Sequence, residues 1–287
     1  MAQHVTAPGI RARKGGTPLV MVTAYDAPTA RIADDAGVDV VLVGDSVAMV
    51  VLGYADTLQV TVAAMAHHVA AVGRARPRAL IVADLPWLSY HLSTEDAVRN
   101  AAALVRAGAA AVKLEGGRNR VPVVEALVDA QIPVMGHLGL TPQSVHALGG
   151  YRVQGQQAEG AASLLEDARA LAAAGCFAIV LECVPREVAR LVTESVPVPT
   201  IGIGAGPDCD GQVLVLHDLL GLEDRIVPKF VRRYASVKAD AVAAVATYAD
   251  DVRSRAFPSD AESYHLSDDV AAALGVDRDR AASSRTA

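Results

Sequence analysis

Polar side chains that could do chemistry stand where short apolar runs of this sequence stop. Asp45 and Ser46 follow one run, Asp84 ends another, and Lys113 and Glu115 lie two residues apart in a third. Three carboxylates without a matching set of Cys or His side chains suit a hard, oxygen-preferring cation such as Mg²⁺. The sequence therefore predicts a magnesium site formed by Asp45, Asp84 and Glu115.

Structural explanations compete with this one. A single Asp or Ser after a strand often caps the next helix, and Asp26 after the first apolar run is in such a place. The acids could also form ion pairs with Lys113 and with surface arginines. Recurrence of polar residues at consecutive runs favours a functional site over these alternatives.

Three of the charged or polar side chains interrupt apolar runs. Lys113 could recognise a carboxylate or an oxyanion beside the metal, or could extend from the rim into solvent. His137, taken alone, is more typical of a hydrogen-bonded core histidine than of a ligand. Glu182 in "FAIVLECV" is a candidate general base, because a buried carboxylate is costly unless it is paired or protonated. A salt bridge is the structural alternative for Glu182.

The elements that must position these residues repeat along the chain. Apolar, β-branched runs alternate with alanine-rich helical patterns, such as 93–108, where Ser93 could cap the helix and Gly108 could end it. Continuous apolar runs are typical of parallel strands covered on both faces. The runs occupy 18–26, 38–46, 78–86, 110–117, 132–140, 176–185, 198–206 and, more weakly, 212–220.

This repetition predicts an α/β protein with a (β/α)₈ barrel, a fold of ~250 residues that carries its functional residues at the carboxyl ends of the strands. A doubly wound open sheet is the competing architecture. We expect residues 1–17 to be an N-terminal extension and 18–265 to be a single barrel domain with extra helices within 226–265. Residues 266–287 are expected to be a mobile tail, because they are rich in charged and small side chains.

Composition limits the partners. The net charge of -6 gives no electrostatic footprint for nucleic acid or for an anionic membrane surface. No apolar stretch of about 18 residues could span a bilayer, and the N-terminus lacks the apolar region of a signal peptide. The odd count of 3 cysteines argues against a disulfide framework. We expect a cytoplasmic protein with a small-molecule substrate.

Several segments, in order along the chain, resemble the ketopantoate hydroxymethyltransferase family. They are "MVTAYDAPTARIADDAGVDVVLVGDS", "IVADLP", "AVKLEGG", "IPVMGHLGLTPQSVHALGGYRVQGQ" and "PTIGIGAGPDCDGQVLVLHDLLG", between about residues 18 and 265. The combination of "GHLGLTPQSV" with "GIGAGPDCDGQVLV" is far more specific than any single aspartate.

The resemblance implies a Mg²⁺-dependent transfer of a hydroxymethyl group from 5,10-methylenetetrahydrofolate to 3-methyl-2-oxobutanoate. The product would be 2-dehydropantoate, in the first committed step of pantothenate biosynthesis. The resemblance also implies a homo-oligomer, a decamer of barrels.

Residue roles follow from the same resemblance. It implies that Asp45 and Asp84 bind the metal and the metal-bound substrate, and that Glu115 supports the metal through water. It implies further roles for four side chains: Ser46, Lys113 and His137 in substrate binding and Glu182 as proton acceptor.

Elementary chemistry agrees with these roles. The substrate proton lies beside a ketone and becomes acidic only when the developing enolate is stabilised, which a Mg²⁺ ion chelated by the ketone and carboxylate oxygens would do. Two segments depart from the family pattern: "LPWLSY" carries Leu88 where the family usually has a glycine, and "GYADTLQVT" differs from the more usual "YDTTLPVT"-like segment. Two alternatives remain, namely a lyase or mutase of the phosphoenolpyruvate-mutase type and a catalytically silent barrel subunit.

Overall fold

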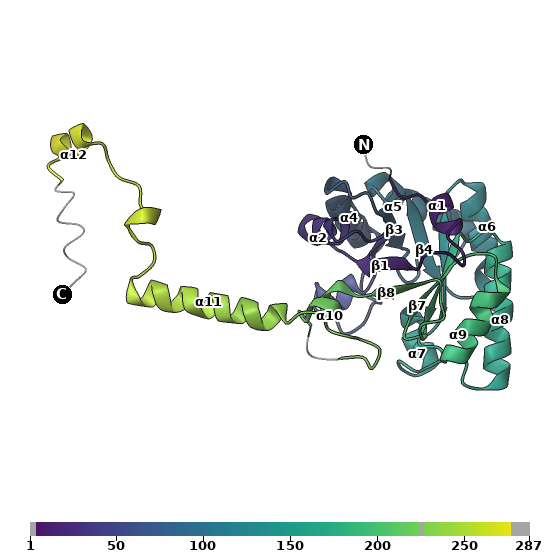
Figure 1. Cartoon of the computed structure of the whole chain (residues 1–287). Helices are drawn as coiled ribbons and strands as arrows, with labels where there is room; N and C mark the ends of the chain where they lie inside the picture. Colours follow the sequence, from purple (N-terminus) through teal and green to yellow (C-terminus); the bar gives the residue numbers. More distant parts are fainter. Residues whose placement is uncertain (1–3, 224–226, 277–287) are drawn as a thin grey trace. The chain divides into compact units, whose positions relative to one another are not determined.

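A closed ring of eight parallel strands forms the centre of the molecule (Figure 1). The computed structural model describes residues 4–223 and 227–276. Pairing of β1 with β8 closes the ring, so the predicted (β/α)₈ barrel is confirmed and the open doubly wound sheet is wrong. The strands are β1 (Leu19–Thr23), β2 (Val40–Val43), β3 (Leu80–Asp84), β4 (Ala111–Glu115), β5 (Val134–Gly139), β6 (Ala178–Glu182), β7 (Thr200–Ile203) and β8 (Gly211–Leu214).

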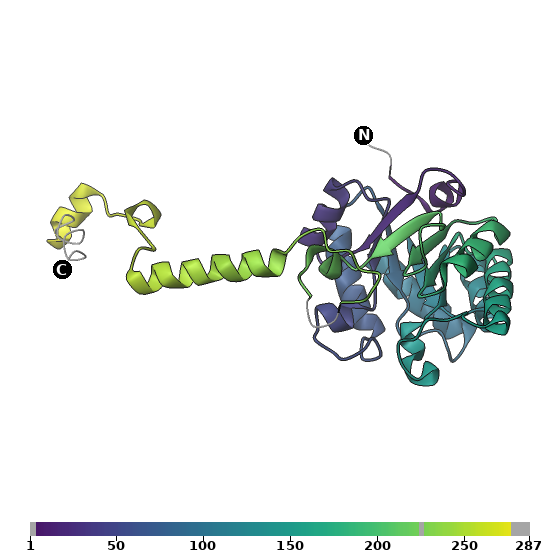
Figure 2. The same ribbon diagram turned by 60° about the horizontal axis from the view of Figure 1, so that its bottom comes forward.

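Helices surround the outside of the ring (Figures 1 and 2). The predicted helix over 93–108 is present, because the Ser93 hydroxyl accepts a hydrogen bond from the Asp96 amide and Gly108 ends the helix at φ 125°. The helices of this unit are α1 (Ala7–Arg11), α2 (Ala27–Asp35), α3 (Val47–Val50), α4 (Val62–Arg74), α5 (Thr94–Ala107), α6 (Val121–Asp129), α7 (Val145–Leu148), α8 (Ala158–Ala173), α9 (Arg186–Ser195) and α10 (Leu216–Leu220), with short 3₁₀ turns η1 (Arg118–Arg120) and η2 (Pro142–Ser144).

Alternation along the strands divides the apolar side chains into two cores. In β2, Val40 and Leu42 belong to the cluster inside the barrel, whereas Val41 and Val43 pack in the layer between strands and helices. Successive strand side chains point to opposite faces, so each strand supplies both cores. The continuous apolar runs of the sequence reflect this burial on both sides.

The N-terminal segment contributes to the interior of the barrel. Ala7 and Ile10 of α1 belong to the same apolar cluster as the inward-facing residues of the strands, and Ile10 is fully buried. In Figure 1, α1 and α7 lie at opposite ends of the barrel. The segment expected to be a mere extension therefore packs against the barrel core.

The eighth strand is short and depends on a close approach of backbones. A Cβ at Gly211 would lie 2.6 Å from the carbonyl oxygen of Leu19, the residue with which Gly211 pairs in β1. Asp210, just before this strand, accepts hydrogen bonds from the Lys14 ammonium at 2.8 Å, the Gly15 amide at 2.9 Å and the Thr200 amide at 2.8 Å. One carboxylate thus joins the N-terminal segment, β7 and the start of β8.

Contacts divide the chain after Ala235, and residues from Ser236 onward form a separate, smaller unit. It contains α11 (Val237–Ser254), the turn η3 (Asp260–Glu262) and α12 (Asp268–Leu274). The extra helix expected within 226–265 is therefore present as α11. Helix α12 lies in the segment expected to be a mobile tail, and residues 277–287 of that tail lie outside the described residues, so the boundary at 265 and the mobility stay predictions.

Candidate active site

The interior faces of four neighbouring strands carry polar side chains at their carboxyl ends. Alternation places Asp84 on the same face as Leu80 and Val82, which line the barrel interior. The parallel register sets Asp84 beside Lys113 and Glu115 beside His137. The interior sets are Leu80, Val82 and Asp84 in β3; Ala111, Lys113 and Glu115 in β4; Met135 and His137 in β5; and Ala178, Val180 and Glu182 in β6.

Asp84 links two of the predicted site residues. Its Oδ1 lies 2.9 Å from the Lys113 ammonium, and its Oδ2 accepts a hydrogen bond of 3.0 Å from the backbone amide of Asp45. All three side chains are buried. Burial opposes the charge of Lys113, but Asp84, Glu115 and Asp45 outweigh it and raise the pKa of this lysine, so it is a permanent cation at the centre of the cluster.

His137 bridges two carboxylates. Its Nδ1 lies 3.4 Å from Oε1 of Glu115 and 3.1 Å from the Lys113 Nζ, and its Nε2 lies 3.2 Å from Oε2 of Glu182. Burial and Lys113 lower the pKa of the imidazole, but the nearby carboxylates of Glu115 and Glu182 prevail and raise it to about 9. The side chain of Glu182 is 16% exposed and therefore reachable, unlike that of Glu115.

Ser46 lies at the edge of this cluster, and Asp26 lies outside it. The Ser46 hydroxyl is 2.8 Å from the Tyr25 hydroxyl, and burial raises the pKa of that phenol. Asp26 caps α2, accepting a hydrogen bond of 2.8 Å from the Thr29 amide. The structural explanation is thus correct for Asp26, whereas Asp45, Asp84, Lys113, Glu115, His137 and Glu182 come together with Ser46 beside them.

Two buried residues of the site were not singled out from the sequence. Gln143 of η2 donates from its amide nitrogen to Asp45 Oδ2 at 2.8 Å, and its backbone amide donates to Glu115 Oε2 at 3.0 Å. The Tyr90 hydroxyl lies 2.6 Å from Gln143 Oε1 and accepts a hydrogen bond of 3.1 Å from the Glu115 amide. Their positions in the sequence could have indicated them, because Gln143 follows β5 and Tyr90 follows β3, and barrel enzymes carry their functional groups in such loops.

The donor set fits a hard cation in its chemistry. Asp45, Asp84 and Glu115 are buried around Lys113, and Asp84 Oδ1 faces that ammonium without a well-aligned hydrogen bond. Burial, followed by repulsion from Asp84 and Glu115, raises the pKa of Asp45 well above its usual range. A cluster with surplus carboxylates is stabilised by added positive charge.

The side chains are not arranged as a finished metal centre. Within the described part of the chain, no three His, Cys, Asp or Glu side chains converge closely enough to hold an ion. The Lys113 ammonium contacts Asp84 and the Gln143 amide contacts Asp45, so protein donors occupy oxygens that a cation would use. The magnesium site therefore stays a prediction.

The loop after β3 adopts an uncommon backbone conformation. Leu88 has φ 67°. This left-handed region favours glycine because it lacks a Cβ. Trp87 and Leu88 are 42% and 46% exposed, so this loop places two large apolar side chains in solvent.

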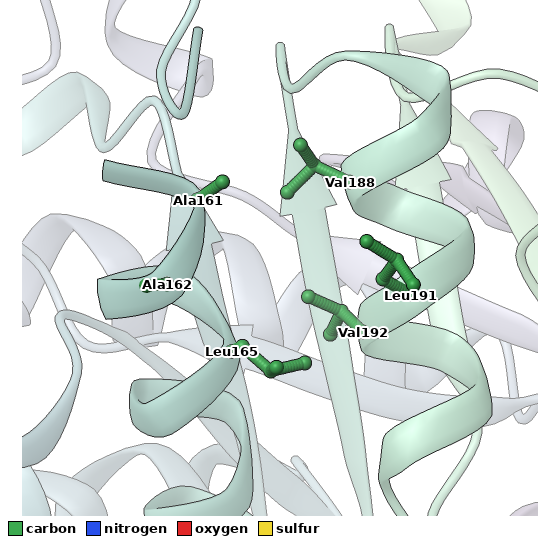
Figure 3. A pocket seen from close by; sticks show the side chains of 6 residues that line it. All are labelled: Ala161, Ala162, Leu165, Val188, Leu191 and Val192. Atoms are coloured by element: carbon green, nitrogen blue, oxygen red, sulfur yellow. The ribbon is translucent and has the colours of Figure 1, made fainter. Parts of the chain in front are cut away.

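An apolar pocket elsewhere in this unit has a different character. It lies between α8 and α9 (Figure 3) and has a volume of about 150 Å³. Its lining side chains are Ala161, Ala162, Leu165, Val188, Leu191 and Val192, none of which can donate or accept a hydrogen bond. This pocket therefore offers no side chain for acid-base or polar chemistry, unlike the cluster at the strand ends.

The fold and this cluster define a (β/α)₈-barrel enzyme with charged groups gathered at the carboxyl ends of its strands. The chain belongs to the ketopantoate hydroxymethyltransferase family, whose model matches residues 4–260. The 3-methyl-2-oxobutanoate hydroxymethyltransferase of Moorella thermoacetica is 58% identical over 268 residues, covering 92% of this chain and 100% of the relative. The enzyme of that name from Ignicoccus hospitalis is 60% identical over 247 residues, covering 86% and 94%.

Solved structures share the architecture at low identity. Phosphoenolpyruvate phosphomutase from Streptomyces platensis subsp. rosaceus matches with a TM-score of 0.60 and 17% identity, covering 98% of this chain and 99% of that chain. This likeness shows the fold alone. The family match and the high-identity relatives therefore favour a hydroxymethyltransferase over the mutase-type alternative.

Proposed function

We propose that this enzyme transfers a hydroxymethyl group from 5,10-methylenetetrahydrofolate to 3-methyl-2-oxobutanoate, giving 2-dehydropantoate for pantothenate biosynthesis. The observation that carries the proposal is the convergence of all the residues expected from the family at one end of the barrel, in a chain that the family model matches over residues 4–260. The names of the relatives supply the oxoacid and the reaction class.

Binding of the oxoacid is assigned to groups at the rim of the cluster. The oxoacid carries a carboxylate and a ketone oxygen, and Lys113 provides the fixed positive charge that attracts them. The Ser46 hydroxyl, shared with Tyr25, is available as a hydrogen-bond donor. His137 adds a second positive charge below its pKa of about 9.

Proton removal is assigned to Glu182. Its carboxylate is the most accessible acid of the paired groups and lies 3.2 Å from His137 Nε2. The proton on C3 of the oxoacid would pass to Glu182, and the resulting carbon nucleophile would bond to the one-carbon unit of the folate after one of its two C–N bonds has opened. Hydrolysis of the remaining C–N bond by water would then release the hydroxymethyl product and tetrahydrofolate.

A magnesium ion would be held by Asp45, Asp84 and Glu115, whose surplus of negative charge fits it. When bound, it supplies positive charge against the charge that develops on the ketone oxygen. We further propose a homo-oligomer, a decamer as in the family that the chain resembles, and a cytoplasmic location, which suits three cysteines that are all free.

The test is proton NMR of 3-methyl-2-oxobutanoate mixed with purified protein, Mg²⁺ and 5,10-methylenetetrahydrofolate. We expect 2-dehydropantoate to form and its formation to stop when a chelator is added. Exchange of the C3 proton in D₂O without any product would support the proton-transfer step but refute the folate donor. A protein that gives neither product nor exchange would refute the proposal and favour the silent-barrel alternative.

A further inference from the structure

A chain of hydroxyl groups lies beside the acid cluster, where the first, second and eighth strands end. The backbone amide of Leu216, at the start of α10, donates a hydrogen bond of 3.0 Å to the Thr23 hydroxyl. The Tyr25 hydroxyl lies 2.8 Å from the hydroxyl of Ser46. Thr23, Tyr25 and Leu216 are at most 3% exposed, whereas Ser46 is partly exposed. The chain therefore leads from the protein interior to the rim of the site.

The backbone amide at the inner end gives this chain a direction. An N–H group can only donate, so the Thr23 oxygen is an acceptor and its own proton needs another partner. The Tyr25 phenol provides that partner. Burial raises the pKa of this phenol, and hydrogen bonds with Ser46 and Thr23 oppose the rise, so both hydroxyls adjoin the phenol oxygen.

The opposite direction would leave a buried proton unbonded. If Ser46 donated to Tyr25 and Tyr25 donated to Thr23, the Thr23 oxygen would accept two hydrogen bonds. The Thr23 proton would then face no acceptor that the described residues provide, which is costly at a buried position. The favoured order runs from the Leu216 amide through Thr23 and Tyr25 to Ser46.

This order makes Ser46 a donor toward the open side of the site. Its oxygen accepts the phenol proton, so its own proton is available to a bound ligand. Hydroxyls in a chain polarise one another, which strengthens the last donor. A ligand oxygen that only accepts hydrogen bonds, such as the carboxylate or ketone oxygen of an oxoacid, suits a donor fixed in this way.

We propose that Tyr25, supported by Thr23, is a positioning residue that fixes Ser46 as a hydrogen-bond donor to an acceptor oxygen of the oxoacid. This inference rests on the proposed function, because it takes Ser46 as a residue that binds that substrate. Tyr25 and Thr23 act through Ser46 and need no contact with the oxoacid themselves.

The test measures the dissociation constant of 3-methyl-2-oxobutanoate by NMR titration of the purified protein, without folate and at one fixed Mg²⁺ concentration. Tyr25→Phe removes the phenol oxygen but keeps the ring that lies 5.5 Å from the His217 ring. We expect this variant to bind the oxoacid about 3–10-fold more weakly, the effect of one hydrogen bond. Thr23→Val should weaken binding by a smaller factor, and Thr23→Ser, which keeps the hydroxyl, should bind as the wild type does.

A double variant separates positioning from a general structural effect. Because Tyr25 acts through the Ser46 hydroxyl, Tyr25→Phe should weaken binding no further once Ser46→Ala has removed that hydroxyl. Equal losses of affinity from Tyr25→Phe with and without Ser46→Ala would overturn the inference.

Thr193→Val is the matched control. The Thr193 hydroxyl is also buried and lies 2.6 Å from another hydroxyl, that of Thr200, but Thr200 begins β7 at the opposite end of the barrel. Its removal should leave affinity for the oxoacid unchanged. A folded Tyr25→Phe protein with wild-type affinity would overturn the inference. If Tyr25→Phe did not fold, wild-type affinity in Thr23→Val would overturn it equally.

The same measurements separate this inference from the proposed function. If the wild-type protein binds the oxoacid and Tyr25→Phe binds it weakly, the inference stands even when no hydroxymethylated product forms. If both bind it equally and the wild type forms product, the inference fails and the proposed function stands. A wild-type protein that does not bind the oxoacid would refute both.

Discussion

At the scale of single residues, the chemistry depends on charges that the barrel holds in pairs. Lys113 is paired with Asp84, and His137 with both Glu115 and Glu182. Removing one member of such a pair leaves the other charge buried and uncompensated, which is costly. Substitutions that keep the shape and remove only the charge are therefore the informative ones.

Glu182→Gln should lower turnover by ~10²-fold or more, the usual effect of losing a positioned acid-base group. Affinity for the oxoacid should change little, because Glu182 is assigned to the proton and not to the substrate oxygens. The measurement is the rate of C3 proton exchange in D₂O, with the exposed Glu187→Gln on α9 as control. Near-normal exchange in Glu182→Gln would remove this residue from the mechanism.

Asp84→Asn should move the Mg²⁺ dependence of turnover to about tenfold higher concentration or beyond, because one carboxylate of the proposed cation site is lost. The control is Asp26→Asn, since Asp26 also follows a strand but caps a helix, and Asn caps as well as Asp. Identical Mg²⁺ titration curves for wild type and Asp84→Asn would argue against the metal site.

At the scale of elements, short loops carry conformations that their sequences do not favour. Leu88 has φ 67° in the loop after β3. For a residue with a Cβ, this left-handed conformation costs roughly 1–3 kcal/mol. The loop that supplies Tyr90 to the site is therefore strained two residues earlier.

Leu88→Gly should raise the free energy of unfolding by about 1 kcal/mol, because relief of backbone strain exceeds the entropy that glycine adds to the unfolded chain. Urea unfolding measures the change. Leu92→Gly is the control, since Leu92 is 73% exposed but is not among the residues with positive φ. Equal losses of stability in both variants would contradict the strain.

Asp210 closes the barrel, and its protonation state should be visible in stability. Burial opposes its charge, but hydrogen bonds from Lys14, Thr200 and Gly15 lower the pKa of the Asp210 carboxyl below its usual value. A lowered pKa in the folded state gives stability that is present above the unfolded value of about 3.9 and is lost as pH falls through the folded value.

Asp210→Asn should therefore cost about 1.5–3 kcal/mol in urea unfolding at pH 7, and the difference from wild type should shrink below about pH 4. Glu194→Gln removes an exposed ion pair with Arg190 and should cost less than about 1 kcal/mol. If the free energy of unfolding lost by Asp210→Asn is the same at pH 7 and pH 3, ionisation of Asp210 does not contribute to stability.

At the scale of the whole molecule, the smaller unit has more apolar surface than it covers. Within α11 no residue is buried, and Val242, Val245, Tyr248 and Val252 are 62%, 66%, 55% and 43% exposed. Their spacing of three and four residues places them on one side of the helix. An exposed apolar stripe of this kind is typical of a protein contact surface, and the homo-oligomer stays a prediction.

Val245→Glu should reduce the molar mass measured by light scattering, because a charge would enter the apolar stripe of α11. Thr247→Glu is the control, since Thr247 lies on the other side of the same helix and is exposed. A monomeric wild-type chain, or a molar mass that Val245→Glu leaves unchanged, would contradict a role of this stripe in self-association.

No helix among the described residues is long and apolar enough to span a membrane.

The sequence by itself determined the barrel and most of the cluster. Strand side chains alternate, so the spacing of Lys113 and Glu115 already placed them on one face, and the carboxyl ends of parallel strands meet at one end of a barrel. Apolar runs and helix caps such as Ser93 are local patterns, so they predict where strands and helices lie without reference to the rest of the fold. The family motifs added the roles that spacing alone left open.

Only the tertiary structure decided which polar groups contact one another. Gln143 and Asp45 are 98 residues apart, and nothing local to either predicts their hydrogen bond. The same is true of the contact of Tyr90 with Glu115 and of the joining of β1 to β8, because these pairings depend on the closure and register of the whole ring. Local patterns set which face a side chain occupies, whereas its partner is chosen by segments that only folding brings within reach.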